Sequence, residues 1–208
     1  MTVSDQTVER TVTPPYTPMA REILREWVQT DSLRKHCEAV AACMGHFAEE
    51  QGADEDLWFA VGLLHDMDFE RYPDMDAGEA GHPYVGVRYL LEIGWGSEVT
   101  RAVLTHADYT GVEPISPMER TLRAVDELSG FVTAVALVRP DKSVHTVQVS
   151  SVRKKMKDKA FAAKVSRDDI REGAELLDRP LDDVIQDVID ALRASADRLG
   201  LQGILVPV

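Results

Sequence analysis

Several features that are common in secreted and membrane proteins are scarce in this sequence. Its 208 residues include only two cysteines. Cys37 and Cys43 lie six positions apart in one helical stretch, which is poor geometry for a mutual disulfide, so we expect them to be core residues in a reducing cytosol. No apolar run is long enough to span a bilayer, and residues 1–18 contain no hydrophobic signal region. These absences predict a cytoplasmic protein that does not enter a membrane.

Positive charge is also in short supply. The chain has 23 lysine and arginine residues against 36 aspartate and glutamate residues, which gives a formal net charge of −13. Proteins that bind nucleic acid normally present a basic surface, and anionic membranes attract basic segments. We therefore expect neither nucleic acid nor a membrane as partner. An anionic substrate would need local positive charge from a metal ion or from lysine and arginine.

The alternating pattern of β-strands is nearly absent. Residues 143–150 are the one candidate, as a strand or as an extended link, and there is no internal repeat. Helical periodicity runs through most of the chain after about residue 17, and a hydrophobic content of 44% is enough for a core. We predict a single all-α domain of bundled helices over residues 18–200. It has a core over 30–140 and a helical extension over 141–200, between an N-terminal arm (1–17) and a C-terminal tail (201–208).

Capping signals give approximate helix boundaries. Thr30 and Gly52 bracket the first helix of interest, Pro83 is expected at the first position of another, and Ser116 with Glu119 forms a capping box. Pro180 begins the last predicted amphipathic helix. The predicted helices cover residues 31–52, 57–66, 83–93, 97–106, 116–138, 166–177 and 180–199.

The pair His65-Asp66 is the most informative feature of the chain. It ends the apolar helical run 57–64, where an unpaired charge or imidazole would cost several kcal/mol to bury, and a bound metal would supply the partner. Further histidines and an aspartate occupy core-facing or helix-terminal positions on separate predicted helices: His36, His82, His106 and Asp126. Histidine and carboxylate ligands without cysteine favour a catalytic site for Mn, Fe, Mg or Zn over a closed structural zinc site.

The order of these residues resembles the HD-domain superfamily of metal-dependent phosphohydrolases, and in particular its small stand-alone members. The motifs that carry the resemblance are LLHDMDFE (63–70), GHPYVGVRYL (81–90), AVLTHADYTG (102–111), ERTLRAVDELSGFVTAVALVRPDK (119–142) and SVRKKMKDKAFAAKVSR (151–167). By this resemblance, the four ligands that define the superfamily correspond to His36, His65, Asp66 and Asp126. His82 and His106 match the further histidines of members with two metals, in which Asp66 would bridge. If one ion is shared, Asp126 must lie within about 6 Å of His65.

The resemblance implies hydrolysis of a small phosphorylated molecule, such as a nucleotide, assisted by one or two divalent metals (Mn, Fe, Mg, Zn, Co or Ni). The metals would polarise a phosphoryl oxygen and activate a water molecule. A loop carboxylate, Asp68 or Glu70, is a candidate proton relay. The candidates for neutralising phosphate charge are Arg71, Lys154, Lys155 and Lys157. The sequence leaves a homodimer open.

Each of these residues also has a simpler interpretation. A single histidine such as His36 or His106 on an apolar face is more often a core residue with a hydrogen-bond partner than a ligand. His82 near a helix N-terminus could bind backbone amides, the lysine-rich segment could be a solvated face, and Asp68 and Glu70 could be ordinary loop acids. The complete ordered set favours a metal site.

Two alternative functions remain open at the level of sequence. The first is a mixed-valent di-iron oxygenase, because some HD proteins with this six-ligand set have that activity. The second is a non-catalytic module that senses nucleotides or binds a protein. A pure binding module has no need of all six metal-ligating side chains, so the hydrolase is the preferred interpretation.

Overall fold

The computed structural model describes residues 11–204, and these form ten α-helices and three short 3₁₀-helices without a strand. This confirms the predicted all-α class. The helices are α1 (Tyr16–Trp27), α2 (Asp31–Gln51), α3 (Glu55–Leu64), η1 (Met75–Ala80), α4 (Tyr84–Glu92), α5 (Ser97–Thr105), η2 (Asp108–Thr110), α6 (Pro117–Leu137), η3 (Val144–Thr146), α7 (Val149–Met156), α8 (Arg167–Leu176), α9 (Leu181–Ala194) and α10 (Ala196–Leu199). None of the described helices is long and apolar enough to cross a membrane.

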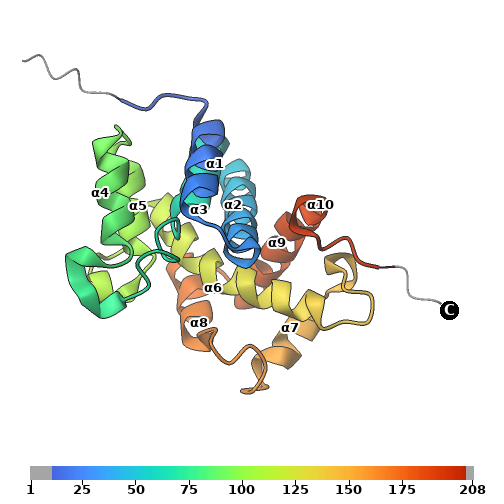
Figure 1. Ribbon diagram of the computed structural model, residues 1–208. Helices are drawn as coiled ribbons and strands as arrows, with labels where there is room; N and C mark the ends of the chain where they lie inside the picture. The colour runs from blue at the N-terminus through green and yellow to red at the C-terminus, as the bar shows by residue number, and fades with distance from the viewer. Residues whose placement is uncertain (1–10, 205–208) are drawn as a thin grey trace, which may run out of the picture.

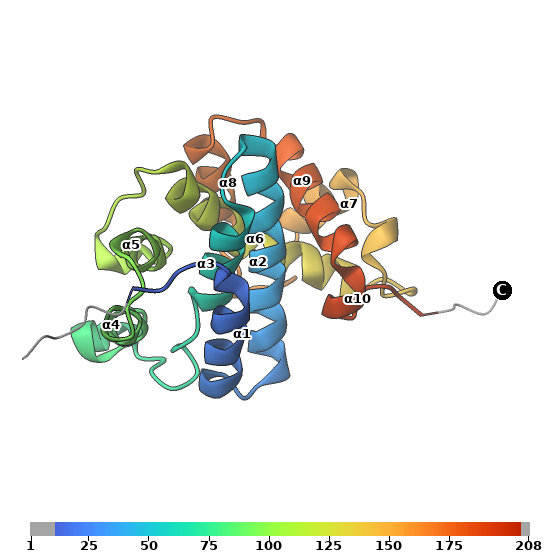
Figure 2. The same ribbon diagram turned by 90° about the horizontal axis from the view of Figure 1, so that it is seen from above.

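The two longest helices, α2 and α6, form the centre of the bundle (Figures 1 and 2). They contact each other, α3 and α9 pack on α2, and α5, α7, α8 and α9 pack on α6. The reason lies in the apolar stripe of α2, where Cys37, Val40, Met44 and Phe47 are at most 1% exposed. Helices α4 and α5 lie side by side at one flank of this bundle (Figure 2).

A glycine allows α2 and α3 to approach very closely. A Cβ atom at Gly62 would lie only 2.5 Å from the Cα atom of Ala41, so any side chain at position 62 would push the two helices apart. Because α3 ends two residues later, this contact also fixes where His65 lies relative to α2.

Most predicted helix boundaries agree with the structure within one or two residues. The Asp54 carboxylate accepts a hydrogen bond from the Leu57 amide at the start of α3. Ser116 and Glu119 form the predicted capping box of α6. Gly52 ends α2 with a φ angle of 64°, a left-handed conformation that glycine adopts at little cost.

The candidate strand over residues 143–150 was wrong, since this segment contains η3 and the first turn of α7. Val144 and Val147 are both fully buried and lie three residues apart, which is the period of a 3₁₀-helix rather than of a strand. The Val144 amide donates to the carbonyl oxygen of Leu201, so the start of the predicted C-terminal tail is bound to the domain.

Three other boundaries differ from the predicted ones. Helix α4 begins at Tyr84, with Pro83 as its N-cap rather than its first residue. Ser195 interrupts the predicted last helix and separates α9 from α10. At the N-terminus, α1 already begins at Tyr16, and the Val12 amide binds the carbonyl oxygen of Gly94. The rest of the predicted arm (1–10) and tail (205–208) lies outside the described residues.

Candidate metal centre

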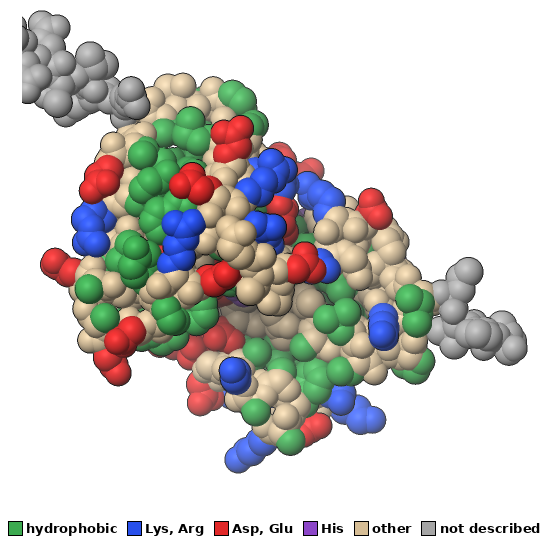
Figure 3. All heavy atoms as spheres, in the orientation of Figure 1, with side chains coloured by type: hydrophobic (Ala, Val, Ile, Leu, Met, Phe, Trp, Pro, Cys, Tyr) green, Lys and Arg blue, Asp and Glu red, His purple; other side chains and the backbone are tan. Residues whose placement is uncertain are grey.

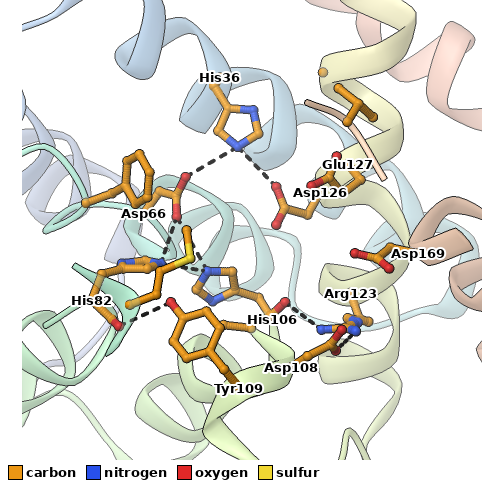
Figure 4. A pocket seen from close by; sticks show the side chains of 15 residues that line it. His36, Asp66, His82, His106, Asp108, Tyr109, Arg123, Asp126, Glu127 and Asp169 are labelled. Carbon is orange, nitrogen blue, oxygen red and sulfur yellow. Dashed lines mark hydrogen bonds and ion pairs between the residues drawn. The ribbon is translucent and has the colours of Figure 1, made fainter. Parts of the chain in front are cut away.

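The structure brings all six predicted metal ligands together, although they come from five different helices or helix ends. Five of the six, all except His65, line a cavity of about 410 Å³ (Figure 4). His36 lies on α2 and Asp126 on α6. His65 is the C-cap of α3, with Asp66 directly after it. His106 is the C-cap of α5, and His82 precedes the N-cap of α4. This cavity opens as a hollow near the centre of the face in Figure 3, beside a group of acidic side chains.

His36, His65 and Asp126 form one potential ion site, which we call the inner triad. The Nε2 atom of His36 lies 3.2 Å from Nε2 of His65 and 3.0 Å from Oδ1 of Asp126. Nε2 of His65 lies 3.5 Å from the same Asp126 oxygen. Two ligand atoms that are each about 2.1 Å from one ion lie about 3.0–3.4 Å apart in octahedral or tetrahedral geometry. The inner triad therefore has the spacing of a coordination shell.

Asp66, His82 and His106 form a second potential ion site, the outer triad. Oδ1 of Asp66 lies 3.3 Å from Nε2 of His82 and 3.4 Å from Nε2 of His106, and these two nitrogens are 3.1 Å apart. The other oxygen of Asp66, Oδ2, lies 3.6 Å from Nε2 of both His36 and His65. Asp66 thus presents one carboxylate oxygen to each triad, as a carboxylate that bridges two cations would.

Hydrogen bonds fix the tautomers of three of the histidines. Nδ1 of His65 donates to the carbonyl oxygen of Gly62 at 2.8 Å, and Nδ1 of His106 donates to that of Val103. Nδ1 of His82 contacts Oδ1 of Asp68 at 2.6 Å. Each bond places the ring proton on Nδ1 and leaves the Nε2 lone pair directed at the cluster, which is the form that binds metals. His36 differs, because its side chain is 25% exposed and no partner of its Nδ1 is recorded within residues 11–204.

The electrostatics of the cluster also fit a cation. Burial opposes ionisation of the Asp66 and Asp126 carboxylates, but the neighbouring histidines outweigh burial and hold the pKa of both carboxyls well below the ordinary value. Burial likewise opposes protonation of His65, yet the two carboxylates raise its pKa to about 9. No lysine or arginine of the described chain pairs with Asp66 or Asp126. These buried negative charges therefore require protons or metal ions, and the fixed Nε2 lone pairs favour metal ions.

Two residues that the sequence analysis did not single out border the cluster. Arg123 lines the cavity, and its Nη1 donates to the main-chain oxygen of His106 at 2.9 Å. The Tyr109 hydroxyl donates to the main-chain oxygen of His82 at 3.1 Å. Arg123 lies one helical turn before Asp126, and this spacing is a signal that could have identified it.

Asp68 and Glu70, the two candidate proton relays, accept hydrogen bonds that position other parts of the chain. Asp68 is 1% exposed and accepts hydrogen bonds from both His82 and the Gly86 amide, so it orients the His82 ring and does not line the cavity. Glu70 does not line the cavity. Its Oε2 accepts from the amides of Gln29 and Thr30 at the start of α2 and so caps that helix.

The four candidate phosphate-binding cations are also absent from the cavity lining. Arg71 donates from Nε to the main-chain oxygen of Trp27, and its guanidinium lies 4.6 Å from the centre of the Trp27 ring. The lysines belong to α7 and the turn after it. Lys155 lies over the Phe161 ring, and Lys154 and Lys157 are exposed to solvent. These side chains stabilise helix packing or solvate the surface.

Residues 33–130 match the family model of the HD domain. This segment contains all six residues of the two triads and the greater part of the cavity lining. Over this segment, just under half of the chain, the sequence is similar to the HD domain. No curated protein and no solved structure matches the chain.

Proposed function

We propose that this protein is a phosphohydrolase that uses two divalent cations to hydrolyse a phosphate ester of a small molecule, with nucleotides as one candidate class. The observation that carries the proposal is the position of Asp66, whose two oxygens face different triads. Cations bound there would polarise a phosphoryl oxygen and lower the pKa of a water molecule toward neutrality.

The charge of the cavity supports two cations rather than one. Its lining includes five carboxylates and, within the described part of the chain, a single arginine and no lysine: Asp66, Asp108, Asp126, Glu127, Asp169 and Arg123. Two divalent cations would balance the net negative charge of this lining, whereas one would leave a field that repels phosphate. The cavity volume of about 410 Å³ is in the range of small-molecule sites.

The residues around the triads prepare the site in distinct ways. Asp68 keeps His82 in the tautomer that binds a cation through Nε2. Tyr109 holds the main chain of the same histidine. The apolar side chains of Phe69, Met75 and Val165 cover part of the cavity lining and reduce its contact with water.

Elemental analysis of protein purified without added metal, followed by a phosphatase panel, tests the proposal. The panel should supply Mn, Fe, Co, Ni and Mg separately and compare phosphomonoesters, phosphodiesters and nucleotides. We expect about two cations per chain and turnover that EDTA abolishes. No hydrolysis of any phosphate ester by protein with two bound cations would refute the proposal.

The same experiment separates the oxygenase, since this donor set also suits iron. An oxygenase would contain iron, consume O2 and show an EPR signal from a mixed-valent pair. A protein that binds nucleotides without turnover under any metal would instead be a sensing module.

A further inference from the structure

One positively charged side chain lines the cavity among the described residues, and it is largely buried. Arg123 on α6 is 7% exposed and is the only lysine or arginine among the described residues that line the cavity. Its Nη1 binds the main-chain oxygen of His106, and its Nη2 forms an ion pair with the carboxylate of Asp108 (Figure 4). The guanidinium therefore lies next to the outer triad.

The two partners of this ion pair differ in their access to water. The side chain of Asp108 is 64% exposed, whereas that of Arg123 is 7% exposed. Separation would cost Asp108 little, because water solvates its carboxylate. Arg123 would be left as a buried charge without an anion, which is costly. The arrangement thus favours an exchange in which another anion replaces Asp108 on Arg123.

The geometry of the arginine suits such an exchange. The bond from Nη1 to His106 fixes the guanidinium while Nη2 changes partner. A planar guanidinium matches the oxygens of a phosphate and forms strong charge-assisted hydrogen bonds with them. The other charged groups in the lining beyond the two triads, Glu127 and Asp169, are carboxylates that repel an anion. Arg123 is accordingly the place in the lining that attracts a phosphoryl group.

We propose that Arg123 forms an anion-binding subsite for the phosphoryl oxygens of the substrate, and that Asp108 occupies this subsite until substrate replaces it. The inference deepens the proposed function and rests on it for the identity of the anion. In this proposal Arg123 binds the phosphoryl group of the substrate, and Asp108 competes with that group for Arg123. No covalent step is involved.

The test measures the affinity of the full chain for inorganic phosphate by titration calorimetry, in both metal-loaded and metal-stripped protein. Arg123→Lys should weaken phosphate binding at least about tenfold, because a lysine cannot contact His106 and phosphate together in this geometry. Asp108→Asn should strengthen binding about 1.4-fold to fivefold, which corresponds to the 0.2–1 kcal/mol of an exposed ion-pair partner. Both effects, as ratios of variant to wild type, should persist without metal, although phosphate binds more weakly when no cation balances the carboxylates of the lining. Asp168→Asn, which breaks the exposed pair with Arg171, is the matched control and should leave the affinity unchanged.

The opposite signs of the two variants distinguish binding from a structural role. If Arg123 and Asp108 only stabilise the His106 segment, both substitutions would weaken phosphate binding or leave it unchanged, and either result overturns the subsite. If Arg123→Lys fails to fold, Asp108→Asn alone decides by its sign, and phosphate should raise the melting temperature of this variant more than that of the wild type.

Failure of the subsite is distinguishable from failure of the proposed function. Opposite effects on phosphate affinity in a protein that hydrolyses no phosphate ester would support the subsite and refute the phosphohydrolase. Hydrolysis by a protein in which neither variant changes phosphate affinity would support the phosphohydrolase and refute the subsite.

Discussion

The inner and outer triads are supported by different parts of the molecule. The inner triad combines α2, the end of α3 and α6, and α2 packs against both of the other helices in the centre of the bundle. The outer triad depends on the flanking helices α4 and α5. His82 is fixed by the hydrogen bond that its Nδ1 donates to Asp68 and by the one that its main-chain oxygen accepts from Tyr109, rather than by a position within a helix. Packing of long helices thus positions one triad, and a few polar contacts position the other. We expect the outer triad to bind its cation more weakly and to lose it first to a chelator.

The largest effect should come from Asp66→Asn, because Asp66 is the one of the six candidate ligands that presents a carboxylate oxygen to each triad. Asparagine keeps the shape but not the charge that balances the cations, and metal binding depends on deprotonated ligands. Cation stoichiometry should fall from two toward zero, and turnover should fall by more than the roughly 100-fold upper value for supporting residues. Elemental analysis measures the cation stoichiometry, the increase in melting temperature on addition of metal reports cation binding, and a phosphatase assay measures turnover. A variant that retains most of its turnover would refute the bridging role of Asp66.

His106→Ala should separate the triads. The inner triad does not contain His106, so stoichiometry should fall from two to one while the remaining cation keeps its affinity. His36→Ala is the converse variant and should remove the inner cation. Unchanged stoichiometry with lost activity in His106→Ala would instead make this histidine a phosphate contact in an enzyme with one metal.

Asp68→Asn tests whether polar contacts alone position the outer triad. The amide nitrogen of asparagine cannot accept the hydrogen bond from Gly86, and the uncharged side chain holds Nδ1 of His82 less strongly. Loss of such a supporting partner typically weakens metal binding about 10–100-fold, and here only the outer cation should be affected. The matched control is Glu70→Gln in the same loop, which should leave both metal affinities unchanged. Equal weakening of both cations would contradict the division into two supports.

The smallest effect concerns Glu127, next to Asp126 of the inner triad. Burial, followed by repulsion from Asp126, raises the pKa of Glu127 from 4.5 to about 7. A raised acid pKa means that the folded state binds the proton more tightly, so the cost to folding grows from about pH 4.5 to pH 7 and is complete above pH 7. Glu127→Gln should therefore stabilise metal-stripped protein at pH 8 by about 1 kcal/mol, after allowance for the partial exposure of Glu127.

The control for this prediction is the same pair of proteins at pH 4.5, where the wild type and Glu127→Gln should unfold at nearly equal denaturant concentrations. Saturation with metal should reduce the difference at pH 8, because cations offset the repulsion from Asp126. A difference that does not depend on pH would indicate a packing effect rather than a charge effect.

The sequence predicted the helices well because their signals are local. Apolar periodicity and caps such as Ser116 and Asp54 depend on residues three or four positions apart, and the structure keeps these interactions. The pattern at 143–150 was misread because its β-branched residues favour a strand locally, whereas the contact of Val144 with Leu201 is a tertiary interaction that no local pattern reports.

The supporting residues of the site could not be predicted in the same way. The tasks of Asp68 and Glu70 depend on the path of the loop over 65–83, which brings one acid to Gly86 and the other to Thr30. The spacing of apolar residues in the sequence carries no information about the path of this loop. Arg123 carries a helical spacing signal, but its pairing with Asp108 depends on where η2 lies.

The close contact between Gly62 and Ala41 has a consequence for the choice of ion. The inner triad combines His36 on α2 with His65 at the C-cap of α3, the two helices that meet there. The contact therefore helps to set the distance between the Nε2 atoms of His36 and His65. A methyl group at position 62 would increase the distance between these two nitrogens. The preference of the inner triad would then shift from smaller ions such as zinc toward larger ones such as manganese. Gly62 contacts the ligand His65 through its main-chain oxygen and has no side chain of its own, yet it would in this way influence the ionic radius that the site prefers.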